Sequence, residues 1–522
     1  MITVSLNEAN FEYDIHSLVK AFYGKEDVKV FADKEKIKEL EEEKTPLFHM
    51  EVSYVMGENL AKVGASGLQE YTAVNGDCGR KFPDRIRFEI WEPGEKGLEK
   101  RKEVITEVDF VNRKETKNRM KQCLYRMLQE YTGQELPWGT LTGIRPTKIP
   151  MAMLEDGKTK EEIRRYMKET YYASDKKTDL SIEIAQRELE LLKQIDYENG
   201  YSLYIGIPFC PSICLYCSFS SSPIGMWKDK VDAYLEALEK EIDFTAQICK
   251  NKVLNTIYIG GGTPTTLSAE QMDRLLTKVE ESFDFSGLLE YTVEAGRPDS
   301  ITEEKLVVLR KHGISRISIN PQTMKQETLD YIGRHHTVKQ TVESFQMARK
   351  LGFDNINMDL IVGLPEERIE DVRETMEQIK ELNPDNLTVH SLAIKRAARL
   401  RMFKNEHEDM HIHNSWETID MTAEYAREMG MEPYYLYRQK NMAGNFENVG
   451  YAKPGKAGIY NILIMEEKQS IMALGAGAST KYVFDHGKRI ERVENVKDIK
   501  NYLERIDEMI ERKKRMEEQL WH

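Results

Sequence analysis

The feature that most constrains the fold is a regular alternation of short apolar runs with helix-length amphipathic stretches between residues 201 and 397. The runs cover residues 203–207, 256–259, 290–293, 316–319, 356–361 and 387–390. The stretches between them cover residues 228–249, 269–282, 303–312, 338–351 and 369–382. Such a βα repeat places a parallel sheet inside and helices outside. About six units predict a partial (β/α)6 barrel, in which chemistry collects at the carboxyl ends of the strands.

The chain is too long for one ordinary core, so further domains are expected on either side of this repeat. Residues 1–199 mix helix patterns at 13–23, 112–131, 160–170 and 180–195 with strand patterns at 47–56 and 85–91. We predict an α+β domain of unassigned role at 1–199, the barrel at 200–397 and a mixed α/β accessory domain on the substrate side at 398–522. A run of charges at 512–518 is typical of a solvated helix face.

Charge and hydropathy exclude several classes of protein. The formal net charge is −13, whereas general nucleic-acid binders are normally basic. No apolar run approaches the roughly 20 residues that cross a bilayer. The first ten residues lack the basic-then-apolar layout of a secretory signal. The sequence therefore predicts a cytoplasmic protein with no nucleic-acid partner and no membrane span.

Three of the six cysteines follow the first predicted strand in a C-x3-C-x2-C loop, namely Cys210, Cys214 and Cys217. Such spacing in a cytosolic chain indicates a metal site and not a disulfide framework. A structural zinc site needs four ligands, usually as two separated pairs, and there is no second pair of cysteines. Iron–sulfur clusters are held by thiolates. Three thiolates on a four-iron cluster leave one iron open, so a catalytic 4Fe–4S cluster is favoured and zinc is the alternative.

A glycine-rich turn, Gly260-Gly261-Gly262-Thr263-Pro264-Thr265, follows the second predicted strand. By itself this pattern is typical of an ordinary turn. Glycine also lets a ligand approach the backbone closely, because no Cβ intervenes. The position one strand after the cysteine loop favours the ligand-binding interpretation.

These motifs together resemble the radical S-adenosyl-L-methionine (SAM) superfamily, whose signature is C-x3-C-x2-C with an aromatic residue, here Tyr216, before the last cysteine. The resemblance implies that the open iron chelates the amino and carboxylate groups of SAM. One electron then cleaves the sulfonium bond and yields a 5′-deoxyadenosyl radical, which abstracts hydrogen from substrate. It also implies an electron donor such as flavodoxin or ferredoxin, and contact between the turn at Gly261, Gly262 and Thr263 and the methionine amino group.

The resemblance narrows to the oxygen-independent coproporphyrinogen III oxidase family, including its heme-chaperone branch, over residues 204–397, with a weaker echo at 474–479. It is closest to the coproporphyrinogen dehydrogenase branch, which the segment 143–148 also resembles. The other cofactor-binding residues that the resemblance implies are Tyr204, Glu294, Gln322, Arg334, Asp359 and Ala393. Taken singly, Glu294 could be a helix N-terminal charge, Arg334 a surface residue and Asp359 a strand-end cap. His335, His336 and His390 are interpreted as structural or exposed.

The resemblance implies a tetrapyrrole substrate and an oxidative decarboxylation that converts the propionates of coproporphyrinogen III to the vinyl groups of protoporphyrinogen IX. Such a polyanion needs Arg or Lys side chains, for which Arg145 and Lys148 are candidates. One departure favours a heme-binding chaperone instead: many decarboxylating members have a further cysteine where this chain has Phe219. A radical enzyme acting on heme or another tetrapyrrole, by methyl transfer or ring opening, is a third hypothesis. Catalytic residues beyond the cluster and the cofactor remain unassigned.

Overall fold

A computed structural model describes residues 1–24, 26–33, 35–37, 40, 45–57, 83–95, 97–393, 411–439, 446–484 and 487–520. Their contacts divide them into two compact units. The first unit contains Met1–Pro146 and Met153–Ile182, and the second contains Thr147–Ala152, Glu183–Lys440 and Phe446–His522. The predicted boundaries at 199/200 and 397/398 stay a prediction.

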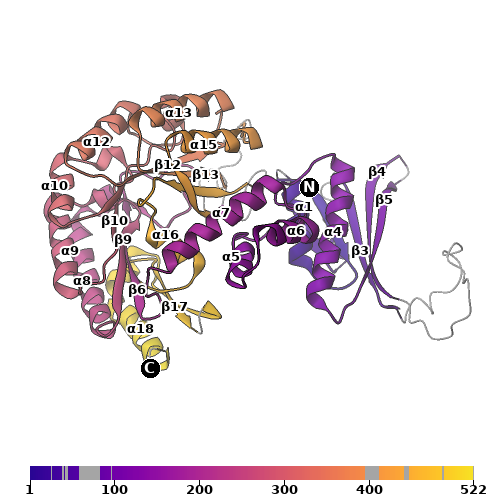
Figure 1. The fold of residues 1–522 in the computed structure, drawn as a ribbon, viewed down its shortest axis with the longest axis horizontal. Coiled ribbons are helices and arrows are strands. Elements are labelled where there is room, and N and C mark those ends of the chain that lie inside the picture. Colours follow the sequence, from indigo (N-terminus) through magenta and orange to yellow (C-terminus); the bar gives the residue numbers. More distant parts are fainter. Residues whose placement is uncertain are drawn as a thin grey trace, which may run out of the picture. The chain divides into compact units, whose positions relative to one another are not determined.

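The first unit is built on a five-stranded sheet with strand order β2-β1-β3-β4-β5 (Figure 1). Strand β1 pairs in parallel with β2 and β3, while β3, β4 and β5 form an antiparallel meander. Helices α1 and α4 share one hydrophobic core with this sheet. The elements are β1 (Ile2–Leu6), α1 (Glu12–Phe22), β2 (Val28–Phe31), β3 (His49–Val55), β4 (Asp84–Gly94), β5 (Gly97–Val108), α4 (Arg113–Thr132) and α6 (Lys160–Tyr171).

The local sequence explains these elements. In β4, Ile86, Phe88 and Ile90 alternate with charged residues and are fully buried, which is the two-residue period of a strand with one face on the core. Helix α4 begins where the Asn112 side chain accepts a hydrogen bond from the Glu115 amide, and it ends at Gly133 in the left-handed conformation. The α1, β3, β4, α4 and α6 patterns read from the sequence are confirmed.

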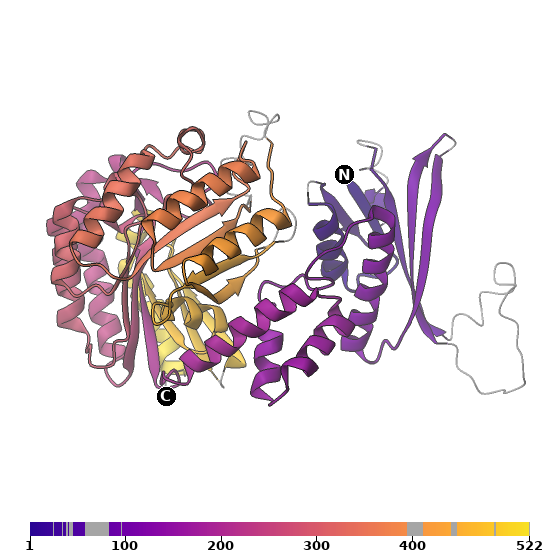
Figure 2. The ribbon, with the colours of Figure 1, turned by 45° about the horizontal axis from the view of Figure 1, so that its top comes forward.

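The second unit contains an eleven-stranded sheet with order β14-β15-β13-β12-β11-β10-β9-β6-β16-β17-β18. Helices lie along the outside of the strands (Figures 1 and 2). The parallel strands are β6 (Gly200–Ile207), β9 (Val253–Gly261), β10 (Glu290–Glu294), β11 (Arg316–Ser318), β12 (Ile356–Val362), β13 (Asn386–Ser391) and β16 (Ser470–Leu474). The principal outer helices are α8 (Val231–Ile248), α9 (Ala269–Ser282), α10 (Glu303–Lys311), α12 (Val338–Lys350) and α13 (Ile369–Leu382).

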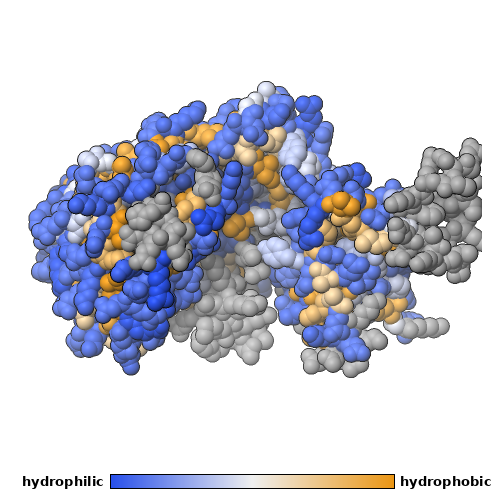
Figure 3. Space-filling view, turned by 90° about the horizontal axis from the view of Figure 1, so that it is seen from below, coloured by the Kyte–Doolittle hydropathy of each residue, from blue (hydrophilic) through white to orange (hydrophobic). Residues whose placement is uncertain are grey.

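Strands β6, β9, β10, β11, β12 and β13 are neighbours in chain order and pair in parallel, which confirms the predicted partial (β/α)6 barrel. Capping boxes begin α9 at Ser268 and α12 at Thr337, so the sequence marks where these helices start. The outer surface of this unit seen in Figure 3 is mainly hydrophilic, as expected of helices whose apolar faces lie against a sheet.

The sheet continues on both sides through residues that the sequence assigned to a separate region after residue 398. On one side β16 pairs in parallel with β6 and carries the antiparallel strands β17 (Ser479–Phe484) and β18 (Arg489–Glu494). On the other, β15 (Asn448–Ala452) pairs antiparallel with β13 and with β14 (Glu432–Tyr437). Helices α15 (Trp416–Glu428), α16 (Ile459–Glu466), α17 (Ile499–Glu504) and α18 (Ile506–Leu520) complete the unit.

Within the charge run at 512–518, Lys513 differs from the prediction of a solvated face. Lys513, on α18, is 0% exposed. Its Nζ is paired with the carboxylate of Glu241 on α8 and donates to the Ala473 carbonyl at 2.7 Å. One charged position in a run can turn inward when a buried carboxylate meets it, and residue type alone does not reveal that partner. Among the described residues, none of the helices combines the length and hydropathy that a membrane span requires.

Candidate functional site

The three clustered cysteines lie on a loop that leaves strand β6 at its carboxyl end. Cys210 ends the short strand β7 (Phe209–Cys210), and Cys214 and Cys217 follow in a turn where the Cys217 amide donates to the Cys214 carbonyl at 3.2 Å. The loop is tied to the segment after α11 (Gln326–Tyr331). There the Leu215 amide donates to the Ile332 carbonyl at 3.0 Å and the Ser212 hydroxyl to the Gly333 carbonyl at 3.1 Å.

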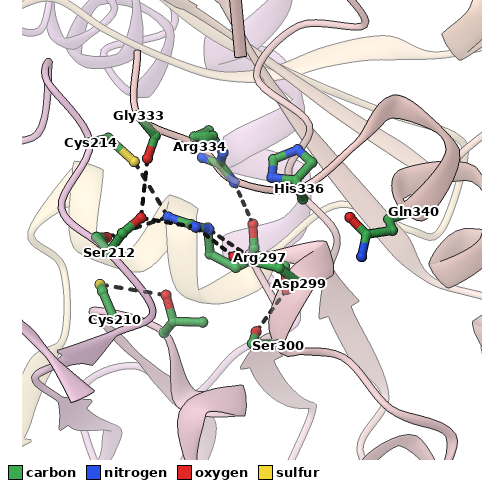
Figure 4. A network of polar contacts seen from close by, with 12 residues as sticks. Cys210, Ser212, Cys214, Arg297, Asp299, Ser300, Gly333, Arg334, His336 and Gln340 are labelled. Atoms are coloured by element: carbon green, nitrogen blue, oxygen red, sulfur yellow. Dashed lines mark hydrogen bonds and ion pairs between the residues drawn. The ribbon is translucent and has the colours of Figure 1, made fainter. Parts of the chain in front are cut away.

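Two of the thiols are in contact with donors from neighbouring strand ends. The Thr263 hydroxyl lies 3.5 Å from Cys210 Sγ, and Arg297 Nη1 lies 3.6 Å from Cys214 Sγ (Figure 4). Burial raises the pKa of Cys210 and raises that of Cys217 to about 11, while Arg297 and Arg334 respectively act in the opposite direction. Burial outweighs the two arginines, so both pKa values remain raised although the arginines favour the thiolate, which is the form that binds metal.

The arrangement of the thiols bears on the kind of metal centre. Within the described ranges, no three His, Cys, Asp or Glu side chains are grouped so that they could hold one metal ion. Cys210, Cys214 and Cys217 are free thiols, buried or half-buried, on one loop. Thiolates are the ligands of a four-iron cluster, so these residues are compatible with one.

The glycine-rich turn packs directly against the cysteine loop. A Cβ on Gly262 would lie 2.5 Å from the Phe209 carbonyl oxygen and 3.0 Å from Cys210 Sγ. Gly261 has φ 109°, and the Thr263 amide donates to the Phe209 carbonyl at 2.7 Å. Close contact between this turn and the backbone at Phe209 therefore already requires a glycine at position 262. Ligand approach at this turn stays a prediction.

Tyr204 faces its partner in the next strand across the barrel sheet. It is in register with Tyr258 on β9, and the two rings stack with centroids 6.3 Å apart. Tyr258 in turn stacks on Tyr460 of α16 at 4.5 Å and donates from its hydroxyl to Glu294 Oε1 at 2.5 Å. Stacking and hydrogen bonding through Tyr258 thus connect Tyr204, on the strand before the cysteine loop, to the Glu294 carboxylate at the end of β10.

Glu294 is not a helix N-terminal charge; its carboxylate lies among the strands. Loss of water around it raises its pKa to about 7. The hydrogen bond from Tyr258 opposes that shift, and the negative charge of Asp359 adds to it. Glu294 and Asp359 are thus close enough to influence each other, as expected of two residues that share one binding site.

Asp359 lies in the middle of β12 and not at its end, which corrects the strand-end placement. Asn357 Nδ2 donates to its Oδ1 at 2.7 Å, and His390 Nε2 on β13 lies 3.9 Å from Oδ2. Although burial opposes ionisation, these neighbours lower the pKa of Asp359, so it is an anion at neutral pH. The Tyr437 hydroxyl lies 3.3 Å from the other ring nitrogen of His390.

Gln322 follows β11 in a conformation that is rare for a residue with a side chain, with φ 69°. The backbone compensates, because its amide donates to the Asp359 carbonyl at 3.0 Å and its carbonyl accepts from Ile361 at 2.9 Å. Its side-chain Oε1 is buried and has no hydrogen-bond partner within the described part of the chain. A strained backbone that presents an unsatisfied amide oxygen is typical of a ligand contact.

Arg334 is buried and not a surface residue. Nη1 donates to the Tyr216 hydroxyl at 3.0 Å, and Nη2 donates to the carbonyls of Gly296 at 2.9 Å and Asn320 at 2.7 Å. Its guanidinium therefore joins the cysteine loop to the ends of β10 and β11. Next to it, His335 is exposed, whereas His336 is 0% exposed and burial lowers its pKa to about 3.

The remaining predicted residues are less closely connected to this group. Ala393 lies just beyond β13 and is half-buried. Lys148, a candidate for substrate carboxylates, has its Nζ 3.4 Å from Glu467 Oε2, so its charge is already compensated. The structure brings Tyr204, Gly261, Glu294, Gln322 and Asp359 into one connected set and Arg334 against the cysteine loop.

Arg297, Tyr258 and Tyr460 were missed by the sequence interpretation. Arg297 lies three residues after β10, in Gly296-Arg297-Pro298-Asp299, and the strand-end rule applied one step further would have found it. Tyr258 sits two residues before Gly260, and strand alternation places it on the face that Tyr204 occupies. Tyr460 carried no such signal, because it comes from a distant apolar helix.

Comparison with known proteins agrees with this geometry. Residues 204–379 match the model of the radical SAM superfamily. An oxygen-independent coproporphyrinogen-III oxidase-like protein of Bacillus subtilis, HemZ, is 42% identical over 412 residues, which is 78% of this chain and 82% of the relative. The aligned length exceeds that of the barrel, so the similarity takes in residues outside it.

Two further similar proteins have different names and activities of their own. The heme chaperone HemW of Lactococcus lactis is 34% identical over 278 residues, covering 53% of this chain and 69% of the relative. The solved structure of the radical SAM enzyme coproporphyrinogen III oxidase, HemN, from Escherichia coli is 24% identical, with a TM-score of 0.49, and covers 62% of this chain and 73% of that one.

Proposed function

This chain belongs to the radical SAM family of oxygen-independent coproporphyrinogen III oxidase-like proteins, and from that membership we propose that it oxidatively decarboxylates the propionates of coproporphyrinogen III. The product is protoporphyrinogen IX. We propose the cytoplasm as its location, because the chemistry needs reduced thiolates and an electron donor such as flavodoxin or ferredoxin.

One observation carries this proposal: the cysteine loop leaves the carboxyl end of β6, and a connected set of polar and aromatic side chains extends from the strands beside it to the middle of β12. A Cβ on Gly262 would lie 2.5 Å from the Phe209 carbonyl oxygen and 3.0 Å from Cys210 Sγ, and a Cβ on Gly261 would lie 3.3 Å from the Tyr204 hydroxyl. Carboxyl ends of parallel strands are where ligands bind in such folds. The site thus supports a cofactor that reaches from the loop to β12.

The residues present fit SAM chemically. Asp359 and Glu294 are carboxylates that would attract the cationic sulfonium and amino groups, and the unpartnered Gln322 Oε1 would accept a hydrogen bond. Tyr204 and Tyr258 offer flat faces beside them. When bound, SAM and a 4Fe–4S cluster on Cys210, Cys214 and Cys217 supply radical chemistry that abstracts hydrogen from substrate. The protein's contribution is to hold the reactants in line and to exclude water.

An anaerobic turnover assay tests the proposal. The reconstituted protein is given SAM, a reductant and coproporphyrinogen III, and deoxyadenosine and porphyrin products are followed by mass spectrometry. Vinyl products that appear in step with deoxyadenosine support decarboxylation. Deoxyadenosine without vinyl products rejects it and directs the search to heme and other tetrapyrroles.

A second candidate is delivery of heme by a chaperone of the same family. It is favoured by Phe219, which stands where many decarboxylating members have a cysteine and whose side chain is 73% exposed beside the cysteine loop. Stoichiometric heme binding that survives removal of the cluster, with no substrate-dependent cleavage of SAM, would support the chaperone. Loss of heme binding in Phe219→Ser, with Val307→Ser at an exposed apolar position outside the loop as control, would locate the heme contact.

A further inference from the structure

Arg297 places a buried positive charge directly against a thiol of the cysteine loop. Its side chain is 4% exposed and lies between the end of β10 and the loop. Nη1 lies 3.6 Å from Cys214 Sγ and 3.4 Å from the Ser212 carbonyl oxygen, and Nη2 lies 3.2 Å from the Ser212 hydroxyl (Figure 4). One edge of the guanidinium therefore spans two positions of the metal-binding loop.

The other edge of the guanidinium is fixed by Asp299. Nε donates to Oδ1 at 2.9 Å and Nη2 to Oδ2 at 2.7 Å, which is the bidentate geometry that holds an arginine in one orientation. The turn itself is closed, because the Ser300 hydroxyl donates to the Arg297 carbonyl at 2.7 Å. Asp299 thus aims Arg297 at the loop and prevents its side chain from turning to solvent.

This arrangement costs desolvation of two charges, so a structural tie alone is a weak explanation for it. Arg334 contacts the same loop through the Tyr216 hydroxyl. The guanidinium of Arg297 is the one that lies against a cysteine sulfur, where bound thiolate would carry negative charge.

We propose that Arg297, oriented by Asp299, is a positioning residue that presets the Cys214 segment and raises the reduction potential of the cluster held there. The proposal rests on the cluster assignment of the proposed function. A hydrogen bond to a ligand sulfur and a nearby positive charge both stabilise the reduced cluster, which has one more negative charge. Arg297 would thereby ease the entry of the electron that the reaction requires.

A redox titration of the reconstituted full-length protein without SAM tests this proposal. The EPR signal of the reduced cluster is followed against potential in wild type, Arg297→Gln and Arg297→Lys. Loss of a hydrogen bond to a charged group is expected to lower the equilibrium constant for reduction about tenfold in Arg297→Gln, a midpoint about 59 mV more negative. Arg297→Lys keeps the positive charge but loses the planar guanidinium, so its midpoint potential is expected between those of wild type and Arg297→Gln.

Controls separate this effect from misfolding. Arg297→Gln leaves the Asp299 carboxylate without its cation, so the double variant Arg297→Gln/Asp299→Asn removes both charges together. Circular dichroism and iron content establish that each variant folds and loads. Arg310→Gln is the matched control, because it removes an exposed arginine from the helix that follows the same strand.

The outcomes distinguish two failures. A wild type that binds no iron–sulfur cluster rejects the proposed function. A wild type that loads normally, with folded and loaded Arg297 variants of unchanged midpoint, overturns the role of Arg297 alone. A midpoint that falls in Arg297→Gln and in the double variant, but not in Arg310→Gln, supports it.

Discussion

Two groups of buried polar side chains in the second unit differ in how fully their partners satisfy them. The Glu241 network comprises Glu241, Asn495, Tyr502 and Lys513. The Glu241 carboxylate accepts hydrogen bonds from the Tyr502 hydroxyl at 2.6 Å, the Asn495 side-chain amide at 2.7 Å and the Gly475 backbone amide at 2.8 Å. It also forms an ion pair with Lys513. Both carboxylate oxygens are engaged by the protein itself. This is the pattern of a network that maintains the fold.

The residues around the cysteine loop are satisfied less completely. Gln322 Oε1, Arg334 Nε and both ring nitrogens of His336 are buried with no hydrogen-bond partner among the described residues. Buried polar atoms are costly to leave unpaired. The Glu241 network has one such atom, Asn495 Oδ1, whereas the residues around the cysteine loop have several. The comparison teaches that a ligand is expected beside the group with more unpaired atoms.

The largest expected effect is on metal loading. Cys214→Ala should abolish iron–sulfur loading and SAM cleavage, because the cluster loses one of three thiolates. The unfolding midpoint of the metal-free protein should stay near that of wild type. Iron and sulfide analysis and thermal unfolding measure the two quantities, with Cys249→Ala, a buried cysteine away from the loop, as control. Full iron loading in Cys214→Ala would contradict the assignment.

The next largest effect should be on stability alone. Lys513→Met leaves the buried Glu241 carboxylate without its cation and should destabilise the second unit by about 3–5 kcal/mol. Lys514→Met, at the exposed neighbouring position, should change stability by no more than about 0.5 kcal/mol. Denaturant unfolding measures both. Equal stability of the two variants would show that the Glu241 network does not stabilise the fold, which contradicts the contrast drawn with the residues around the cysteine loop.

A smaller effect is expected at Asp359. Asp359→Asn removes the anion from the middle of β12 and should weaken SAM binding about 10- to 100-fold, the range for loss of a charged hydrogen bond. Iron content should remain that of wild type. Equilibrium binding of SAM to the loaded protein measures the change, with Asp354→Asn, an exposed aspartate paired with Lys456, as control. Simultaneous loss of iron would indicate misfolding instead.

The smallest expected effect is a pH dependence from Glu294. Its pKa is raised to about 7, so it is largely protonated at pH 6 and ionised at pH 8. A cationic ligand prefers the ionised form, so SAM affinity should rise with pH through this window, by up to about tenfold. Glu294→Gln should flatten the profile. An unchanged slope in that variant would assign the pH dependence to another group.

The sequence predicted the architecture well because its signals are local. Strand alternation at Ile86, Phe88 and Ile90 and the capping residues Ser268 and Thr337 all act within a few positions. The cysteine loop was likewise visible from spacing, whereas Glu294 was identified through the family resemblance. Such features depend on short stretches of chain and need no tertiary information.

The parts that the sequence did not reveal depend on distant partners. Nothing near Lys513 indicates that Glu241, more than 250 residues earlier, would bury it. Tyr460 stacks on Tyr258 across a similar separation in sequence. The strained φ of Gln322 follows from backbone pairing with β12 and not from its residue type. Burial and long-range pairing are products of the assembled sheet, so residue patterns alone underdetermine them.

The pairing of β6 with β16 also sets an order of events during synthesis. Tyr204 faces Ala473 across this pairing, and β6 runs straight into the cysteine loop. The ribosome releases the first five barrel strands after β6 long before it releases residues 470–474. Until then the strand that carries the loop has a neighbour on one side only. Metal loading is therefore expected to follow completion of the chain, and a nascent protein stalled before residue 470 should expose its thiols to oxidation.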